Sequence, residues 1–249
     1  MNTGQEFANC RRSAIPSVSA DQMSMIDDIM INDIGVSLLQ MMELAGGNLA
    51  HLARVRFLDG DPQSKHVAVL AGTGGNGGGG LVAARRLHGW CANVEVWLSK
   101  PAEQYLGVPA HQLRALQRLN IPIHGPDEPM SLGEPELIID ALIGYRLKGD
   151  PSTSIQGLID AANDRGVPVL SLDLPSGLDA TDGHISTSCI RATATLTLAL
   201  PKSGLWKNGA HDVTGELYVA DIGVPESAYA RIGIAPGPIF ARKEILRIG

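Results

Sequence analysis

Seven short apolar runs that alternate with helical segments place the strongest constraint on the fold of this 249-residue chain. Runs without polar alternation are typical of strands buried on both faces of a parallel sheet. The intervening segments, such as Pro109 to Leu119 and Ser154 to Asp164, have the length of crossover helices. The sequence therefore predicts a three-layer, doubly wound, Rossmann-like α/β fold with a mostly parallel sheet. The runs are HVAVLAG, ANVEVWL, IPIHG, ELIIDAL, GVPVLSLD, ATLTLAL and ELYVADIG.

An N-terminal helical extension precedes this alternation. Ser19 and Gln22 form a capping-box pattern, which predicts that a helix begins at the residue after the serine. A second helix is expected over Ser37 to Phe57, where the turn-forming residues DGDPQS end it. We expect one domain over residues 1–249, with residues 1–17 forming a flexible N-terminus.

Composition excludes several classes of protein. The formal net charge is −6 and no basic cluster is present, which argues against nucleic-acid binding. No apolar run approaches the ~18 residues of a membrane span, and the first residues lack the apolar segment of a secretory signal. Three cysteines, Cys10, Cys91 and Cys189, lack the spacing of a disulfide framework or a zinc site. We expect a cytoplasmic protein with neither a nucleic-acid nor a membrane partner.

A glycine-rich stretch follows the first apolar run. In VAVLAGTGGNGGGGLVAARRLHGW, seven of the nine residues from Gly72 to Gly80 are glycine. Gly72, Gly74 and Gly77 match the pattern G-x-G-x-x-G, after a predicted strand and before the helical segment GLVAARRLH. Glycine lets the backbone approach a phosphate, and a helix N-terminus supplies unpaired N–H groups. The stretch therefore predicts a nucleotide-binding loop.

Two acidic residues end later strands. Asp140 ends the apolar part of ELIIDAL, and Asp173 ends GVPVLSLD. Each one alone could simply cap the turn that follows it. If their strands are neighbours of the strand before the glycine loop, the ~4.8 Å spacing of strands brings all three features within about 10 Å. Ligands of doubly wound sheets bind at this carboxyl edge, so we expect one site there.

Four ordered segments carry a resemblance to a known family: MMELAG, GTGGNGGGG, DALIGYRLKGD and LDLPSGLDATDG. On these motifs the chain resembles the NAD(P)H-hydrate epimerases, the family of the YjeF N-terminal domain, from about Val18 to Pro225. The resemblance implies an isomerase of nicotinamide cofactor repair, which interconverts the R and S epimers of hydrated NADH and NADPH. It also implies one potassium ion per subunit.

The resemblance assigns site residues by motif position. It implies that Asn76, Asp140 and Ser176 hold the potassium ion, and a set of oxygens with little charge suits a monovalent cation. We assign the catalytic acid–base role to Asp173, because epimerisation through loss of the C6 hydroxyl or through ring opening requires proton transfer at oxygen. The implied substrate contacts are Gly75, Asn76, Gly77, Gly78, Gly79, Gly144, Tyr145, Arg146, Leu147, Lys148, Gly149, Asp150 and Asp173.

Two departures from the family pattern leave alternatives open. Gly75 and Gly79 stand where the family has Asn and Asp, so a catalytically degenerate nucleotide-binding or scaffold protein is the alternative function. An NAD dehydrogenase is disfavoured, because the strand after the glycine loop ends in WLSK rather than in an acidic residue. The resemblance also implies a homodimer, for which the apolar stretch Val36 to Leu44 is suitable, and a functional link to a separate NAD(P)H-hydrate dehydratase.

Overall fold

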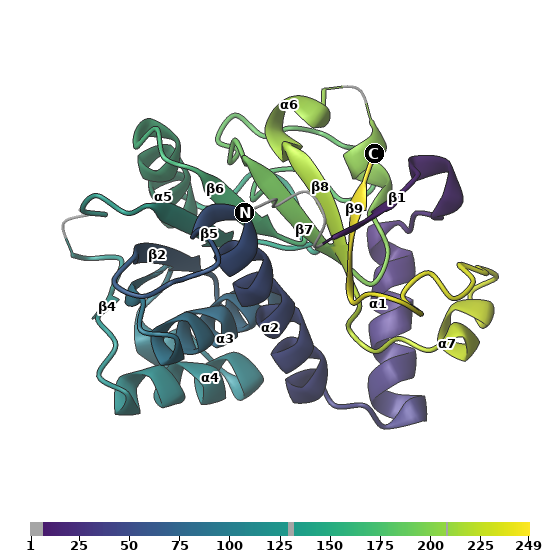
Figure 1. Ribbon diagram of the computed structural model, residues 1–249, viewed down its shortest axis with the longest axis horizontal. Helices are drawn as coiled ribbons and strands as arrows, with labels where there is room; N and C mark the ends of the chain where they lie inside the picture. Colours follow the sequence, from purple (N-terminus) through teal and green to yellow (C-terminus); the bar gives the residue numbers. More distant parts are fainter. Residues whose placement is uncertain (1–6, 129–131, 208) are drawn as a thin grey trace.

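Nine strands form one sheet in this computed structural model, which describes residues 7–128, 132–207 and 209–249 (Figure 1). The strand order is β1-β9-β8-β7-β6-β5-β2-β3-β4, and β8 with β9 is the antiparallel pair among these neighbours. The mostly parallel α/β sheet is therefore confirmed. The strands are β1 (Ala8–Cys10), β2 (His66–Ala71), β3 (Asn93–Leu98), β4 (Ile123–His124), β5 (Leu137–Ala141), β6 (Val169–Leu172), β7 (Ala194–Leu198), β8 (Glu216–Ala220) and β9 (Ile245–Ile248).

Helices cover both faces of the sheet and complete three layers. Helices α2, α3 and α4 lie together on one side, where Leu49 and Leu81 share a core with Val69 of β2 (Figure 1). Helix α5 covers the other side, where Leu158 packs with Leu70. The helices are α1 (Ala20–Asp28), α2 (Leu38–Phe57), α3 (Gly75–Gly89), α4 (Gly107–Arg118), α5 (Thr153–Asp164), α6 (His211–Thr214) and α7 (Glu226–Ala230); a π-helical segment, Ile29–Ile34, continues α1.

The predicted helix starts are confirmed by their caps. The Ser19 side chain accepts from the backbone N–H of Gln22, whose side chain accepts from the Ser19 N–H, and Ser37 forms the same box with Gln40. These reciprocal bonds satisfy N–H groups that a helix start leaves unpaired. No helix among the described residues combines the length and the apolar character that crossing a membrane requires.

The predicted flexible N-terminus is wrong for the part that the structure describes. Ala8–Cys10 form an edge strand that pairs with β9, and Phe7 is buried with its ring edge-on to Tyr218. Strands of three or four residues are too short to carry a recognisable pattern, so the edge strand β1 and its neighbour β9 were not predicted. Residues 1–6 of this prediction lie outside the described residues.

The glycine stretch is largely helix rather than loop, which corrects the sequence prediction. Helix α3 begins at Gly75, and its later glycines lie where a side chain would collide with the protein. A Cβ on Gly78 would lie 2.3 Å from Met42 Sδ. A Cβ on Gly46 of α2 would lie 2.4 Å from the Gly79 carbonyl oxygen. The MMELAG and glycine motifs therefore form the close contact between α2 and α3.

Alanine at Gly80 is expected to destabilise the fold. The alanine Cβ would lie 2.4 Å from the Ala141 Cβ on β5. Overpacking of this kind costs about 1–3 kcal/mol, so we expect the free energy of unfolding to fall by about that amount. Gly157→Ala is the matched control, because Gly157 is inside α5 with open space around it, and alanine there should stabilise by roughly 0.5–1 kcal/mol. Urea unfolding of both variants checks this pair, and equal stabilities would contradict the packing account.

Candidate functional site

The predicted site residues come together at one edge of the sheet. Strands β2, β5 and β6 are neighbours, and parallel strands present their carboxyl ends at the same edge. The start of α3, Asp140 at the end of β5 and Asp173 directly after β6 therefore lie at this edge, as the sequence predicts.

Asp140 is fully buried and its carboxyl group accepts four hydrogen bonds. Oδ1 accepts from Ser176 Oγ at 2.6 Å and from the Leu142 N–H at 3.2 Å. Oδ2 accepts from Ser171 Oγ at 2.8 Å and from the Ser176 N–H at 2.9 Å. Burial raises the pKa of Asp140 above its usual value, and these bonds oppose that shift. Asp140 and Ser176 are therefore in direct contact, and their predicted role as potassium ligands stays a prediction.

Asn76 carries an unpaired buried group and lies near Asp173, the acidic residue that follows β6. Its Nδ2 atom is buried without a hydrogen-bond partner among the described residues. A Cβ on Gly144 would lie 3.3 Å from Asn76 Oδ1 and 3.2 Å from Asp173 Oδ2. These two side chains therefore converge on the same point, and glycine at position 144 keeps that point free of a side chain.

Asp173 is held in a constrained and nearly closed environment. Its backbone is left-handed, with φ 69°, and the residue is only 3% exposed. Oδ2 accepts from the Tyr145 N–H at 3.2 Å, and Oδ1 accepts from the Leu198 N–H at 3.3 Å. A non-glycine residue in this conformation costs energy, and such residues cluster at functional sites. Asp173 thus lies deeper in the protein than a side chain that simply projects into an open cleft.

Lys202 is a site residue that the sequence reasoning missed. It is fully buried, and its Nζ forms an ion pair with Asp173 Oδ1 and donates to the Leu198 carbonyl oxygen at 2.8 Å. Lysine is almost never fully buried unless it is paired, so this residue belongs to the Asp173 environment. In the sequence it follows a buried strand in ALPKSG, and no local spacing links it to Asp173.

The predicted residue Tyr145 connects the site to Asp27 of α1, which the sequence reasoning did not predict. Its hydroxyl donates to Asp27 Oδ2 at 2.5 Å, and the Arg146 Nε donates to the same hydroxyl oxygen at 2.9 Å. Burial raises the pKa of Asp27, against the opposing effects of the Tyr145 bond and the nearby Arg146 charge.

The remaining predicted substrate residues lie on the surface loop after β5. Arg146, Lys148, Gly149 and Asp150 are exposed, and Leu147 is half-buried. Arg146 and Lys148 carry positive charge on the loop whose Gly144 lies beside Asn76 of α3. Positive charge and a helix start both favour phosphate. Their contacts with substrate stay a prediction.

The role first given to three of the predicted glycines needs correction. Gly77, Gly78 and Gly79 are buried against protein atoms, so their lack of a side chain serves packing and does not open a surface for a ligand. The Gly78 N–H donates to the Gly74 carbonyl oxygen, which leaves the amides before it as the unpaired donors of the helix start. Gly74 and Gly75 are exposed with open space around them.

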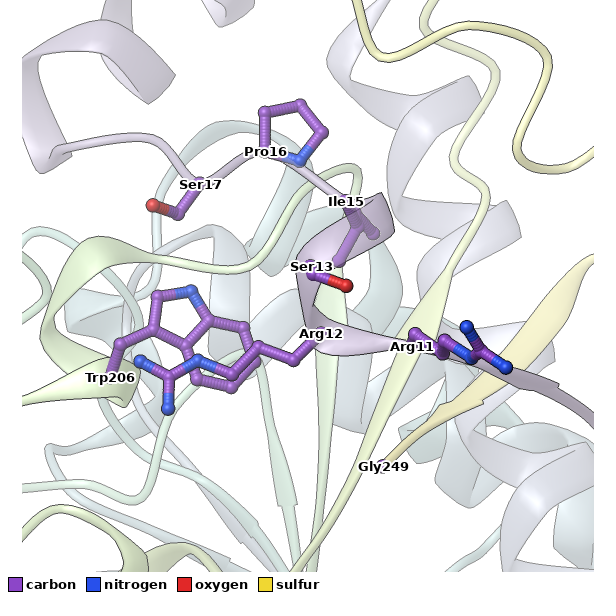
Figure 2. Close-up of a pocket in the computed structure, with 8 residues that line it drawn as sticks. All are labelled: Arg11, Arg12, Ser13, Ile15, Pro16, Ser17, Trp206 and Gly249. Carbon is purple, nitrogen blue, oxygen red and sulfur yellow. The ribbon is translucent and has the colours of Figure 1, made fainter.

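A cavity elsewhere in the described part of the chain contains none of the predicted site residues. It has a volume of about 660 Å³ and adjoins Gly249, which follows β9 near the amino end of β8. Figure 2 shows the Arg12 guanidinium over the Trp206 ring, at 4.5 Å from its centroid. The residues that line this cavity are Arg11, Arg12, Ser13, Ile15, Pro16, Ser17, Trp206 and Gly249. The candidate site is therefore identified by its polar groups rather than by the size of a cavity.

Comparisons with known proteins agree with the motifs. The family model described as YjeF-related protein N-terminus matches residues 38–204. The NAD(P)H-hydrate epimerase of Dehalogenimonas lykanthroporepellens is 38% identical, over 92% of this chain and 91% of that protein. That of Truepera radiovictrix is 37% identical, over 88% and 95%. The bifunctional NAD(P)H-hydrate repair enzyme Nnr of Coxiella burnetii is 34% identical over 80% of this chain, which matches 40% of that longer protein.

A solved structure supports the same assignment. The crystal structure of yeast ynu0, YNL200c, superposes with a TM-score of 0.78 at 27% identity, and the match covers 94% of this chain and 100% of that one. The fold is therefore the Rossmann-like fold that the sequence predicts. Since the family model spans most of the chain and relatives match nearly all of it, the protein belongs to the family of YjeF-related N-terminal domains.

Proposed function

We propose that this protein is an NAD(P)H-hydrate epimerase, an isomerase that interconverts the R and S epimers of hydrated NADH and NADPH. The observation that carries the proposal is the buried Asp173–Lys202 ion pair beside Gly144, at the edge where the family motifs meet. Relatives with this name match about nine-tenths of the chain, which supports the same activity.

The chemistry requires a proton to move at an oxygen atom. The C6 hydroxyl of the hydrated ring leaves and returns, or the ring opens and closes, and either route needs an acid–base group. Asp173 Oδ1 is engaged by Lys202 and by the Leu198 N–H, whereas Oδ2 lies beside Gly144. We therefore assign proton transfer to Oδ2, which the lack of a side chain at position 144 leaves approachable.

The helix start and the surface loop suit the phosphates of the dinucleotide. The N–H groups of Gly75, Asn76 and Gly77 begin α3, where the helix dipole favours an anion. Arg146 and Lys148 add positive charge on the loop after β5. The nicotinamide end would then extend toward Asp173.

We further propose one potassium ion per subunit, held by Asn76, Asp140 and Ser176. The fit rests on Asn76, because turning its buried, unpaired amide by 180° would present an unpaired oxygen, a ligand that potassium accepts. Asp140 would supply negative charge, since its carboxyl already accepts four hydrogen bonds. When bound, the ion supplies positive charge that offsets the buried carboxylate.

The alternative of a degenerate member is not favoured by the two departures in the glycine motif. A Cβ at Gly79 would lie 2.7 Å from Leu172 Cδ2, so the neighbouring leucine occupies the room that a side chain would need there. Apart from its chain neighbours, no atom of the described residues lies within 4 Å of the place where a Cβ on Gly75 would be, so the start of α3 is accessible. The residues to which we assign proton transfer and ion binding, Asp173 and the set Asn76, Asp140 and Ser176, are all present in the sequence.

A homodimer, a separate dehydratase and a cytoplasmic location complete the proposal. Met25, Ile31, Ile34 and Leu44 are large apolar side chains exposed on α1, its π-helical continuation and α2, and a second copy would cover such a surface. Two relatives named as bifunctional NAD(P)H-hydrate repair enzymes support a functional link to an NAD(P)H-hydrate dehydratase. Three free cysteines are compatible with the reducing cytoplasm.

A single-epimer assay tests the proposed function. The purified protein is mixed with one isolated epimer of hydrated NADPH, and the other epimer is followed by chromatography in potassium chloride and in choline chloride. We expect approach to the equilibrium mixture far above the spontaneous rate, and faster with potassium. A rate equal to that of the buffer alone in both salts would favour the degenerate alternative.

A further inference from the structure

Tyr145 connects Asp173 to a second carboxyl group that comes from a different element. Its main-chain N–H donates to Asp173 Oδ2 at 3.2 Å, and its hydroxyl donates to Asp27 Oδ2 at 2.5 Å. Asp173 follows strand β6, whereas Asp27 lies on α1. One residue therefore holds two carboxyl groups, one at each end.

Helix α1 is fixed to the segment that carries the buried lysine. The Val18 N–H donates to the Pro201 carbonyl oxygen at 2.9 Å, and the Ser203 N–H donates to the Val18 carbonyl oxygen at 2.8 Å. These bonds flank Lys202 and lie just before the start of α1. The position of Asp27 relative to the Asp173–Lys202 pair is thus set by the fold.

The two carboxyl groups lie in different electrostatic environments. Asp173 forms a closed ion pair with Lys202, and the two side chains are 4% and 1% exposed. Asp27 is 19% exposed, and the cation paired with it, Arg146, is 3.7 Å away and 69% exposed. Burial and the negative charge of Asp173 raise the pKa of Asp27, while the Tyr145 hydroxyl, Arg146 and Lys202 lower it. Such a difference separates an acid from a base.

Inversion at one carbon atom places a demand on the site. The bond between C6 and its hydroxyl oxygen must break on one face of the ring and form on the other. A carboxylate fixed by an ion pair approaches one face, so a second acid–base group on another element meets this demand.

We propose that Asp27 is the acid partner of Asp173 in epimerisation and that Tyr145 positions both; this inference rests on the proposed function. Asp27 gives its proton to the C6 hydroxyl, the C6–O bond breaks with its electron pair leaving on water, and the ring nitrogen lone pair stabilises the cation. Asp173 then takes a proton from a water molecule whose oxygen bonds to C6 on the opposite face. One proton leaves Asp27 and one arrives at Asp173, and the reverse reaction begins from that exchanged state.

The test compares Asp27→Asn with Asp28→Asn, an exposed neighbour on the same helix. We expect Asp27→Asn to lower kcat by roughly 100-fold or more, the usual contribution of general acid–base catalysis, with KM changed only a few-fold. In the wild type, kcat should fall as pH rises through the pKa of Asp27, because the acid must be protonated. Asp27→Asn should lack this limb, and Asp28→Asn should keep it.

Tyr145→Phe gives a second, signed readout that does not remove a charge from the site. The hydroxyl bond lowers the pKa of Asp27, so its loss should move the alkaline limb of kcat to higher pH. Retention of the wild-type kcat and pH profile by Asp27→Asn, or an unmoved limb in Tyr145→Phe, would overturn the inference while leaving the epimerase activity established. Absence of turnover in the wild type would instead reject the proposed function, and this inference with it.

Discussion

Asp173→Asn is expected to lower kcat for epimer interconversion by about 100-fold or more, since general acid–base groups contribute roughly 10²–10⁴-fold. Asparagine preserves the shape of the side chain and can still accept from the Tyr145 N–H, but it cannot take up a proton. Substrate binding should change less than kcat, because phosphate contacts lie at the start of α3 in the proposed complex.

The control for this variant is Asp160→Asn on α5, which is exposed and lies on the opposite face of the sheet from α3. It should keep the wild-type kcat. Because Asp173→Asn leaves Lys202 buried without its counterion, the rate must be measured on protein whose folding has been checked by circular dichroism. A folded Asp173→Asn variant with the wild-type rate would remove Asp173 from the chemistry.

Lys202→Met is expected to destabilise the fold by about 3–5 kcal/mol, the cost of removing one partner of a buried ion pair. It leaves the Asp173 carboxylate enclosed, with only hydrogen-bond donors such as the Leu198 N–H for compensation. Methionine is chosen because its length and flexibility fill the space of the lysine stem.

The double variant Asp173→Asn/Lys202→Met separates stability from activity. Since it removes both charges, most of the lost stability should return, whereas epimerase activity should not. Urea unfolding of the wild type, the two single variants and the double variant gives the coupling between the two side chains. Additive losses across this cycle would show that the pair contributes nothing specific.

The parallel sheet could be predicted because its central strands are buried on both faces and therefore appear as continuous apolar runs. The cap at Ser19 was also predicted, because a capping box is a local pattern, whereas the box that Ser37 forms with Gln40 was not identified from the sequence. The edge strand β1 and its neighbour β9 were missed, since three or four residues carry no period. The helical state of the glycines was missed because low helix propensity was overridden by packing on Met42 and Ala141.

The candidate site divides in the same way. Asp140 and Asp173 were predictable because strand ends of a parallel sheet meet at one edge. Lys202 and Asp27 were not, since their relation to Asp173 exists only after β7 and α1 have packed around it. Burial also could not be foreseen, so the nearly closed position of Asp173 is a finding of the structure.

Diffraction from a crystal of the Asp173→Asn variant, grown with hydrated NADPH and with thallium in place of potassium, would locate the cation and the nicotinamide ring together. We predict an anomalous peak among Asn76, Asp140 and Ser176, with C6 of the nicotinamide ring adjacent to position 173 and the phosphates at the start of α3. A cation peak elsewhere, or a ring bound away from position 173, would show that these groups do not form one epimerase site.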